Sequence, residues 1–142
     1  MSEDLEKGPV DEMARALLRE RVESFEQLEA LLLLHAHRDR AWSPEAVAEE
    51  LRIQTPEAEA ALEHLCRNAL LGVRVGSKAV VFAYNPGSPD LADAVDRLAR
   101  AYDDSRLEIM RLMSRSTIER VRTQALRVFA DAFVVGRRKK DG

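Results

Sequence analysis

The sequence predicts a mostly α-helical protein with one small β-hairpin, arranged as a helix-turn-helix followed by a wing. Two observations indicate this arrangement. A Ser-Pro pair at residue 43 and a Thr-Pro pair 12 residues later each mark the start of a helix. From Leu71 onward, the apolar residues change from helical spacing to an alternating pattern around a Gly-Ser pair, which is typical of a hairpin.

Composition limits the class of protein. A chain of 142 residues is long enough for one domain with a real core and one appendage. Cys66 is the single cysteine, which excludes an internal disulfide framework and fits a reducing compartment. The first eight residues are too polar for a signal peptide, and the longest leucine-rich run is far shorter than the ~18 apolar residues of a membrane span. We therefore expect a soluble cytoplasmic protein.

The first third of the chain predicts a disordered lead-in and two helices. Residues 1–9 are polar and form the lead-in, and residues 10–21 carry one apolar stripe. Ser24 is a good N-cap, with Gln27 three residues later as its capping-box partner. The following helix, residues 25–38, is apolar on most of its circumference, which is typical of a central helix.

The helix-turn-helix itself follows. Ser43 is expected to cap a helix of eight residues, and Trp42 to pack back onto that helix near Val47. A three-residue turn, 52–54, separates it from a longer helix over residues 55–69, with Thr55 as the cap.

The hairpin spans residues 71–84. With Gly76 and Ser77 as a two-residue turn, Val75 pairs with Lys78. One face is then apolar apart from this lysine, so the hairpin is expected to lie on the helices. Together, residues 10–87 are expected to form the helix-turn-helix and wing domain.

Residues 88–135 are expected to form a helical extension. Ser88 and Pro89 repeat the start signal, and a break near residues 103–104 stays open because Ser105 is a second possible cap. An apolar stripe with spacing of three and four either packs on the protein's own helices or forms a dimer seam. Its residues are Leu91, Val95, Leu98, Tyr102, Ile109 and Leu112.

The end of the chain predicts a separate last helix and a tail. Ser116 with Glu119 resembles another capping box, so the last helix is expected over residues 117–134. Gly136 is expected to end it, which leaves residues 136–142 as a loose basic tail.

Residues 25–84 resemble the MarR-like bacterial regulators of the winged helix-turn-helix superfamily. The motifs that carry the resemblance are Ser43-Pro44-Glu45, Thr55-Pro56-Glu57 and the hairpin around Gly76. The resemblance implies a three-helix core with a wing, often dimeric. It also implies that the helix from Thr55 is a recognition helix and that the hairpin tip touches the phosphate backbone of DNA.

The charges on this helix disagree with ordinary DNA reading. Its exposed face presents Glu57, Glu59 and Glu63 before any basic residue, whereas DNA affinity comes largely from Lys and Arg on phosphates. The same carboxylates also suit the positive end of a helix dipole. The residues expected to contact nucleic acid are Arg67, Asn68, Arg74 and Lys78.

Charge is divided unevenly along the chain. Residues 1–104 carry 12 Lys and Arg against 21 Asp and Glu, a net charge of −9, and residues 105–142 carry 10 against 4, a net of +6. The basic segment either contacts nucleic acid or pairs with the acidic body or a second subunit. The residues of this segment that could neutralise phosphates are Arg111, Arg115, Arg120, Arg122, Arg127 and those of 137–140.

No pattern for catalysis, metal binding or cofactor binding is present. His35 and His37 are two residues apart on a helix and diverge, so they cannot share a metal. There is no Cys-x-x-Cys pair and no glycine-rich phosphate loop, and Cys66 has no visible catalytic partner. We therefore expect a non-enzyme without metal or cofactor.

The sequence leaves two candidate functions. The first is a small, non-enzymatic, homodimeric winged-helix regulator that binds DNA through helix 55–69 and the wing, 71–84. The alternative is a winged-helix protein interaction module without DNA binding. There, the acidic face formed by Glu57, Glu59 and Glu63 would meet a basic partner, or the basic tail of a neighbouring subunit.

Overall fold

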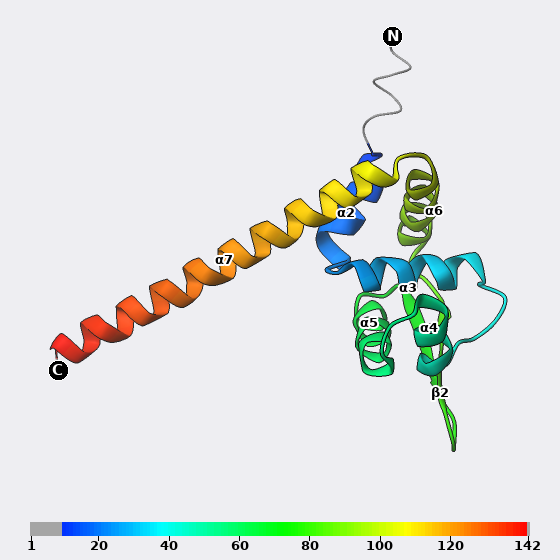
Figure 1. The fold of residues 1–142 in the computed structure, drawn as a ribbon, viewed down its shortest axis with the longest axis horizontal. Helices are drawn as coiled ribbons and strands as arrows, with labels where there is room; N and C mark the ends of the chain where they lie inside the picture. The colour runs from blue at the N-terminus through cyan, green and yellow to red at the C-terminus, as the bar shows by residue number, and fades with distance from the viewer. Residues whose placement is uncertain (1–9, 142) are drawn as a thin grey trace, which may run out of the picture.

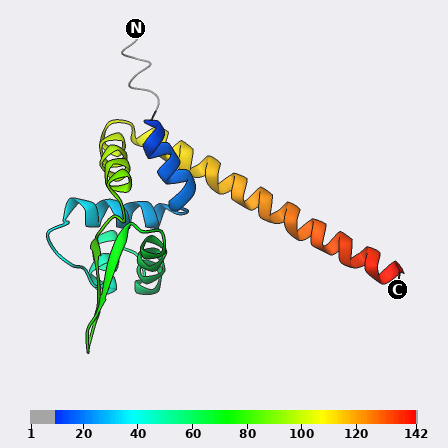
Figure 2. The ribbon, with the colours of Figure 1, turned by 180° about the vertical axis from the view of Figure 1, so that it is seen from behind.

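A computed structural model describes the backbone of residues 10–141, together with their side chains except at 116, 117, 120, 129 and 131–141. The predicted lead-in, 1–9, lies outside the described residues. A long central helix, α3 (Phe25–Ala36), separates two layers (Figures 1 and 2). The helix-turn-helix and hairpin lie on one side of it. On the other side lie α2 (Glu12–Arg21), α6 (Pro89–Asp104) and the start of α7 (Arg106–Asp141).

The first two helices begin where side chains satisfy their free backbone N–H groups. Asp11 caps α2, and its Oδ1 accepts a hydrogen bond from the Met13 N–H at 2.8 Å. Ser24 caps α3 as predicted, with its Oγ accepting from the Gln27 N–H at 3.1 Å. The central position expected for α3 is confirmed, because its fully buried residues are Leu28, Ala30, Leu31 and Leu34.

The first helix and the turn have the predicted lengths, but the second helix has a different cap and ends at Arg67, two residues before the predicted end at residue 69. Helix α4 (Pro44–Leu51) begins at Ser43, as expected, and Arg52 turns the chain with a left-handed φ of 60°. Helix α5 (Thr55–Arg67) is capped by Gln54, whose N–H donates to Glu57 Oε1 at 2.9 Å. The predicted Thr55 cap is therefore wrong by one residue, because Thr55 already has helical backbone.

The hairpin is present, but its predicted register is wrong. Strands β1 (Leu71–Val75) and β2 (Val80–Tyr84) are antiparallel, and Val75 pairs with Val80 rather than with Lys78. The loop contains four residues, closed by a hydrogen bond from the Gly76 N–H to the Ala79 carbonyl at 2.8 Å. Because the error is two residues, each side chain keeps its predicted face of the sheet.

Only the base of the hairpin packs on the helices. The side chain of Trp42 is buried in the core that also contains Val47, and its backbone pairs with Phe82 through two hydrogen bonds of 2.7 Å, as an isolated bridge beside the hairpin. Farther out, the side chains of Val73 and Val75 are 53% and 74% exposed. The expectation that the hairpin lies on the helices is therefore wrong beyond its base, and the wing projects into solvent (Figure 1).

The C-terminal part divides into α6 (Pro89–Asp104) and α7 (Arg106–Asp141), so the chain breaks at Ser105. The apolar stripe packs inside the protomer. Val95, Leu98 and Ile109 are fully buried, so these three are not available to a second copy. The other members, which pack partly buried against the same core, are Leu91, Tyr102 and Leu112.

Helix α7 is one continuous helix. The predicted start after Ser116 and the predicted end at Gly136 are both wrong, since the helix continues to Asp141. A serine with a following glutamate marks a start only after a break, and one glycine costs a helix only about 1 kcal/mol. The predicted loose tail is thus helical to Asp141, while its side chains lie outside the described part. Among the helices that the structure describes, none has the length and apolar character to span a bilayer.

Candidate nucleic-acid interface

Helix α5 presents its outer side to solvent. Its inner side packs on α3 and α4 through the buried residues Ala58, Ala61, Leu62 and Leu65. Beyond Pro56, the exposed side of the helix is mostly acidic. Its residues are Glu57, Glu59, Ala60, Glu63 and Arg67.

The helix-turn-helix surface is acidic. The carboxylate of Glu57 accepts a hydrogen bond from the Gln54 N–H at the start of α5. Glu59 and Glu63 form no ion pair with any described residue, so their charge is not neutralised locally. Helix α4 adds further exposed carboxylates at Glu45, Glu49 and Glu50. Such a surface repels phosphate, and the arginines that offset it are Arg52 in the turn and Arg67 at the end of α5.

The wing carries the basic residues best placed for phosphate. Arg74 lies on β1 opposite Val81, and Lys78 lies in the four-residue loop at the tip. Both side chains are exposed, and neither forms an ion pair with a described residue. Two cations on a hairpin that leaves the body are sterically free to approach a duplex.

Asn68 has a different position from the one expected of a nucleic-acid contact. It is half-buried at the end of α5, and its Nδ2 donates to the His64 carbonyl at 2.9 Å. The backbone carbonyl of Asn68 accepts a hydrogen bond from Arg21 Nη1 at 2.8 Å. His64 Nε2 in turn lies 3.0 Å from the Arg21 carbonyl. This cluster joins the ends of α2 and α5, so Asn68 holds the helix in place.

A second polar cluster joins the C-terminal end of α3 to α6 and to β2. His35 Nε2 lies 2.8 Å from Asp96 Oδ1 on α6, and the Arg38 guanidinium lies over the Tyr84 ring. Burial raises the pKa of the Tyr84 hydroxyl, which has no hydrogen-bond partner among the described residues. Sequence patterns could not reveal this pair, because His35 and Asp96 are distant in the chain.

The histidines and the cysteine do not gather. No group of three or more metal-ligating side chains lies together in the described part of the chain. Cys66 is half-buried, and burial, with Glu63 nearby, raises the pKa of its thiol. A thiol with a raised pKa is a poor nucleophile near neutral pH.

Comparison with solved structures identifies the fold as a winged helix. HlyU from Vibrio cholerae matches with a TM-score of 0.51 at 18% identity, over 72% of this chain and 99% of that one. MepR, described as a transcription regulator of the Staphylococcus aureus multidrug efflux pump MepA, matches with a TM-score of 0.51 at 17% identity, over 84% of this chain and 87% of that one.

A MepR mutant bound to an oligodeoxyribonucleotide also matches, with a TM-score of 0.51 at 16% identity, over 92% of this chain and 91% of that one. No family model and no curated protein matches the sequence. Identities this low establish a shared winged-helix fold and leave the activity of this chain to be argued from its own residues.

Proposed function

We propose that this protein is a non-enzymatic winged-helix regulator that binds duplex DNA through its wing and the C-terminal end of α5. The supporting observation is the hairpin, which projects from the body beside the helix-turn-helix (Figure 1) and carries the exposed side chains of Arg74 and Lys78. Arg67 adds a third exposed cation at the end of that helix. The fold is shared with a MepR mutant that was solved with an oligodeoxyribonucleotide. This function requires no cofactor and suits a cytoplasmic protein.

The acidic face of α5 defines how the protein would bind. Phosphate contacts supply most of the affinity, whereas Glu59 and Glu63 oppose close approach of the backbone. A carboxylate can accept a hydrogen bond from cytosine N4, but it cannot neutralise phosphate. Contacts by the wing and Arg67 therefore dominate, and α5 enters the groove less deeply than a basic helix would.

We further propose that the protein acts as a homodimer joined through α7. The outer part of this helix leaves the body, and a helix without tertiary contacts is only marginally stable in water (Figure 2). Ile118, Val121 and Val128 are 60%, 61% and 62% exposed. At 3.6 residues per turn, they share one face with Leu107 and Met110, away from the buried Ile109 and Met113. An exposed apolar stripe of this length fits the same stripe of a second copy.

Salt-dependent binding to a random-sequence duplex tests the DNA proposal. We expect fluorescence anisotropy to detect binding at low salt that weakens steeply as salt rises. The double variant Arg74→Ala, Lys78→Ala should bind at least about tenfold more weakly. Its salt slope should fall by about 0.9 for each phosphate that the variant no longer neutralises.

A matched control separates the wing from the basic C-terminal segment. Arg100→Ala with Arg122→Ala removes the same charge from exposed positions on α6 and α7. This variant should keep near wild-type affinity. Absence of binding at low salt would contradict the proposal, and so would equal decreases in affinity in the two double variants.

One observation favours a second candidate, a protein interaction module. A hollow of about 240 Å³ lies between the start of α3 and α5, and it holds two carboxylates but no cation among its described lining residues. These residues are Ser24, Glu26, Gln27, Glu57, Ala60 and Ala61. An acidic hollow beside an acidic helix is suited to a lysine or arginine side chain of a basic partner.

A further inference from the structure

The loop between α3 and α4 places an exposed arginine beside the wing. Residues 37–43 leave the C-terminal end of α3 and return beside β2 to the start of α4 (Figure 1). Within this loop, the guanidinium carbon of Arg40 lies 3.8 Å from the centre of the Trp42 ring. Arg40 is exposed and forms no ion pair with a described residue. Its charge is therefore available to an anionic partner.

Trp42 connects Arg40 to the wing. The backbone of Trp42 pairs with Phe82 of β2 through two hydrogen bonds of 2.7 Å, and its side chain is only 5% exposed. An aromatic face attracts a guanidinium group that stacks on it, which limits the orientations of the arginine side chain. Arg40 is thus held in place against β2 and loses less side-chain entropy on binding than an unsupported surface arginine would.

Arg40 and Arg74 lie on opposite faces of the sheet. Trp42 pairs with Phe82, and Phe82 pairs with Val73, so these three side chains share one face. Arg74 follows Val73 in β1 and therefore points to the other face. Arg40 is stacked on Trp42 and so belongs to the first face. A phosphate strand that passes either face of the wing meets a cation.

The rest of the wing also suits a nucleic-acid strand. Residues 71–84 contain two cations, Arg74 and Lys78, and no carboxylate. Between Arg40 and the tip, the first face presents three valines that are between 38% and 74% exposed. They are Val73, Val75 and Val80. A DNA strand combines anionic phosphates with less polar deoxyribose rings, and this face offers a contact for each of them.

The neighbours of Arg40 in the loop have other positions. Arg38 is directed toward α6, where its Nη2 lies 3.9 Å from Asp96 Oδ1, and its guanidinium lies over the Tyr84 ring. Asp39 is exposed and forms no ion pair with a described residue, so its carboxylate lowers the positive potential beside Arg40. Removal of the Asp39 charge should therefore have the opposite effect on anion binding to removal of the Arg40 charge.

We propose that Arg40 is a further phosphate contact of the DNA-binding surface, and that it neutralises a phosphate separate from the one at Arg74. The assignment rests on the proposed DNA binding, because Arg40 joins the same surface. Two phosphate strands border each groove of a duplex, so cations on opposite faces of one hairpin are placed to contact different phosphates. Trp42 is the positioning residue, since it holds Arg40 from within the core.

Anisotropy titrations of the intact chain with a random-sequence duplex at several salt concentrations test the assignment. We expect Arg40→Gln to bind at least about threefold more weakly at low salt, with a salt slope lower by about 0.9. Adding Arg74→Ala should lower the slope by the same amount again, because separate phosphates contribute independently. Asp39→Asn should strengthen binding. A double variant whose slope falls no further than that of Arg40→Gln would contradict contacts with separate phosphates.

Arg106 provides the matched control. It is exposed and lies over the Tyr102 ring, 4.7 Å from its centre, on the other side of α3. Arg106→Gln should bind DNA as wild type, and Arg40→Lys should keep the wild-type salt slope because the charge is retained. Circular dichroism verifies that each variant is folded.

The outcomes separate this assignment from the proposed function. If Arg74→Ala, Lys78→Ala weakens binding while Arg40→Gln binds as wild type, the role of Arg40 is overturned and DNA binding through the wing stands. Equal losses of affinity in Arg40→Gln and Arg106→Gln would also overturn the role of Arg40. A wild-type chain that does not bind duplex at low salt would overturn both.

Discussion

Replacement of Val121 and Val128 by glutamate is expected to convert the protein from a dimer into a monomer. Both valines lie on the exposed stripe of α7, with 61% and 62% of their surface open to solvent in the protomer. A fully buried valine contributes about 1.5 kcal/mol, and a buried unpaired glutamate costs more, so association should weaken at least about 100-fold. Sedimentation equilibrium over a range of protein concentrations measures this change.

The matched control lies on the same helix and away from the stripe. Thr123→Glu adds one charge at an exposed position of α7 and should leave the dimer intact. Helix content measured by circular dichroism should fall in the Val121→Glu, Val128→Glu variant, because the outer part of α7 is then no longer packed against a second helix. A wild-type protein that sediments as a monomer would contradict dimerisation through α7, as would a double variant that remains dimeric.

Replacement of Glu59 and Glu63 by lysine is expected to raise affinity for random duplex DNA at least about tenfold. The two residues lie on the exposed face of α5 and form no ion pair with a described residue. Each change removes a repulsive charge and adds a cation that can neutralise phosphate, so the salt slope should steepen by up to about 0.9 per residue. Anisotropy titrations at several salt concentrations measure both effects.

The same variant distinguishes DNA binding from protein interaction. Asp103→Lys with Asp104→Lys makes an equal charge change at the exposed end of α6 and should alter DNA affinity much less. If α5 serves only a basic protein partner, the Glu59→Lys, Glu63→Lys variant should no longer bind that partner. Equal gains in DNA affinity in both lysine variants would show that net charge, rather than the position of α5, controls binding.

Local signals predicted most helix starts of this fold. Ser24, Ser43 and Ser88 all cap helices through their hydroxyl groups, because a capping hydrogen bond spans only three residues. The sequence did not decide whether the helix breaks at Ser105, since the apolar stripe continues across that residue. The exposed acidic face of α5 was also predicted, because helical spacing alone decides which residues share a face.

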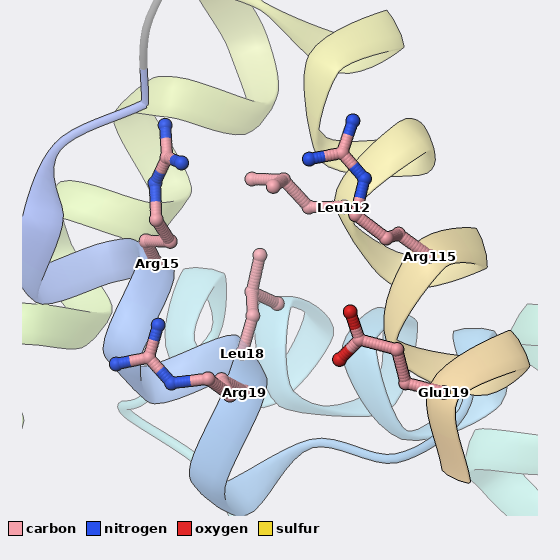
Figure 3. Close-up of a pocket in the computed structure, with 6 residues that line it drawn as sticks. All are labelled: Arg15, Leu18, Arg19, Leu112, Arg115 and Glu119. Atoms are coloured by element: carbon pink, nitrogen blue, oxygen red, sulfur yellow. The ribbon is translucent and has the colours of Figure 1, made fainter. Parts of the chain in front are cut away.

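Features set by tertiary contacts could not be predicted. The register of the hairpin depends on a four-residue loop and on the pairing of Trp42 with Phe82, which are 40 residues apart. Asn68 looked like an exposed contact, yet the distant Arg21 binds its carbonyl. The hollow between α2 and α7 was missed for the same reason, because Arg15 and Arg115 line it from opposite sides only through the packing of α2 on α7 (Figure 3).

A nuclear magnetic resonance titration of the nitrogen-labelled chain with a random-sequence duplex at low salt tests the central claim most directly. The claim is that the wing and the C-terminal end of α5 form the DNA-binding surface. We expect the backbone amide signals of residues 72–80, and those around Arg67, to shift progressively as duplex is added, while the signals of α6 stay unchanged. Shifts confined to α7, or the absence of any shift at low salt, would contradict the claim.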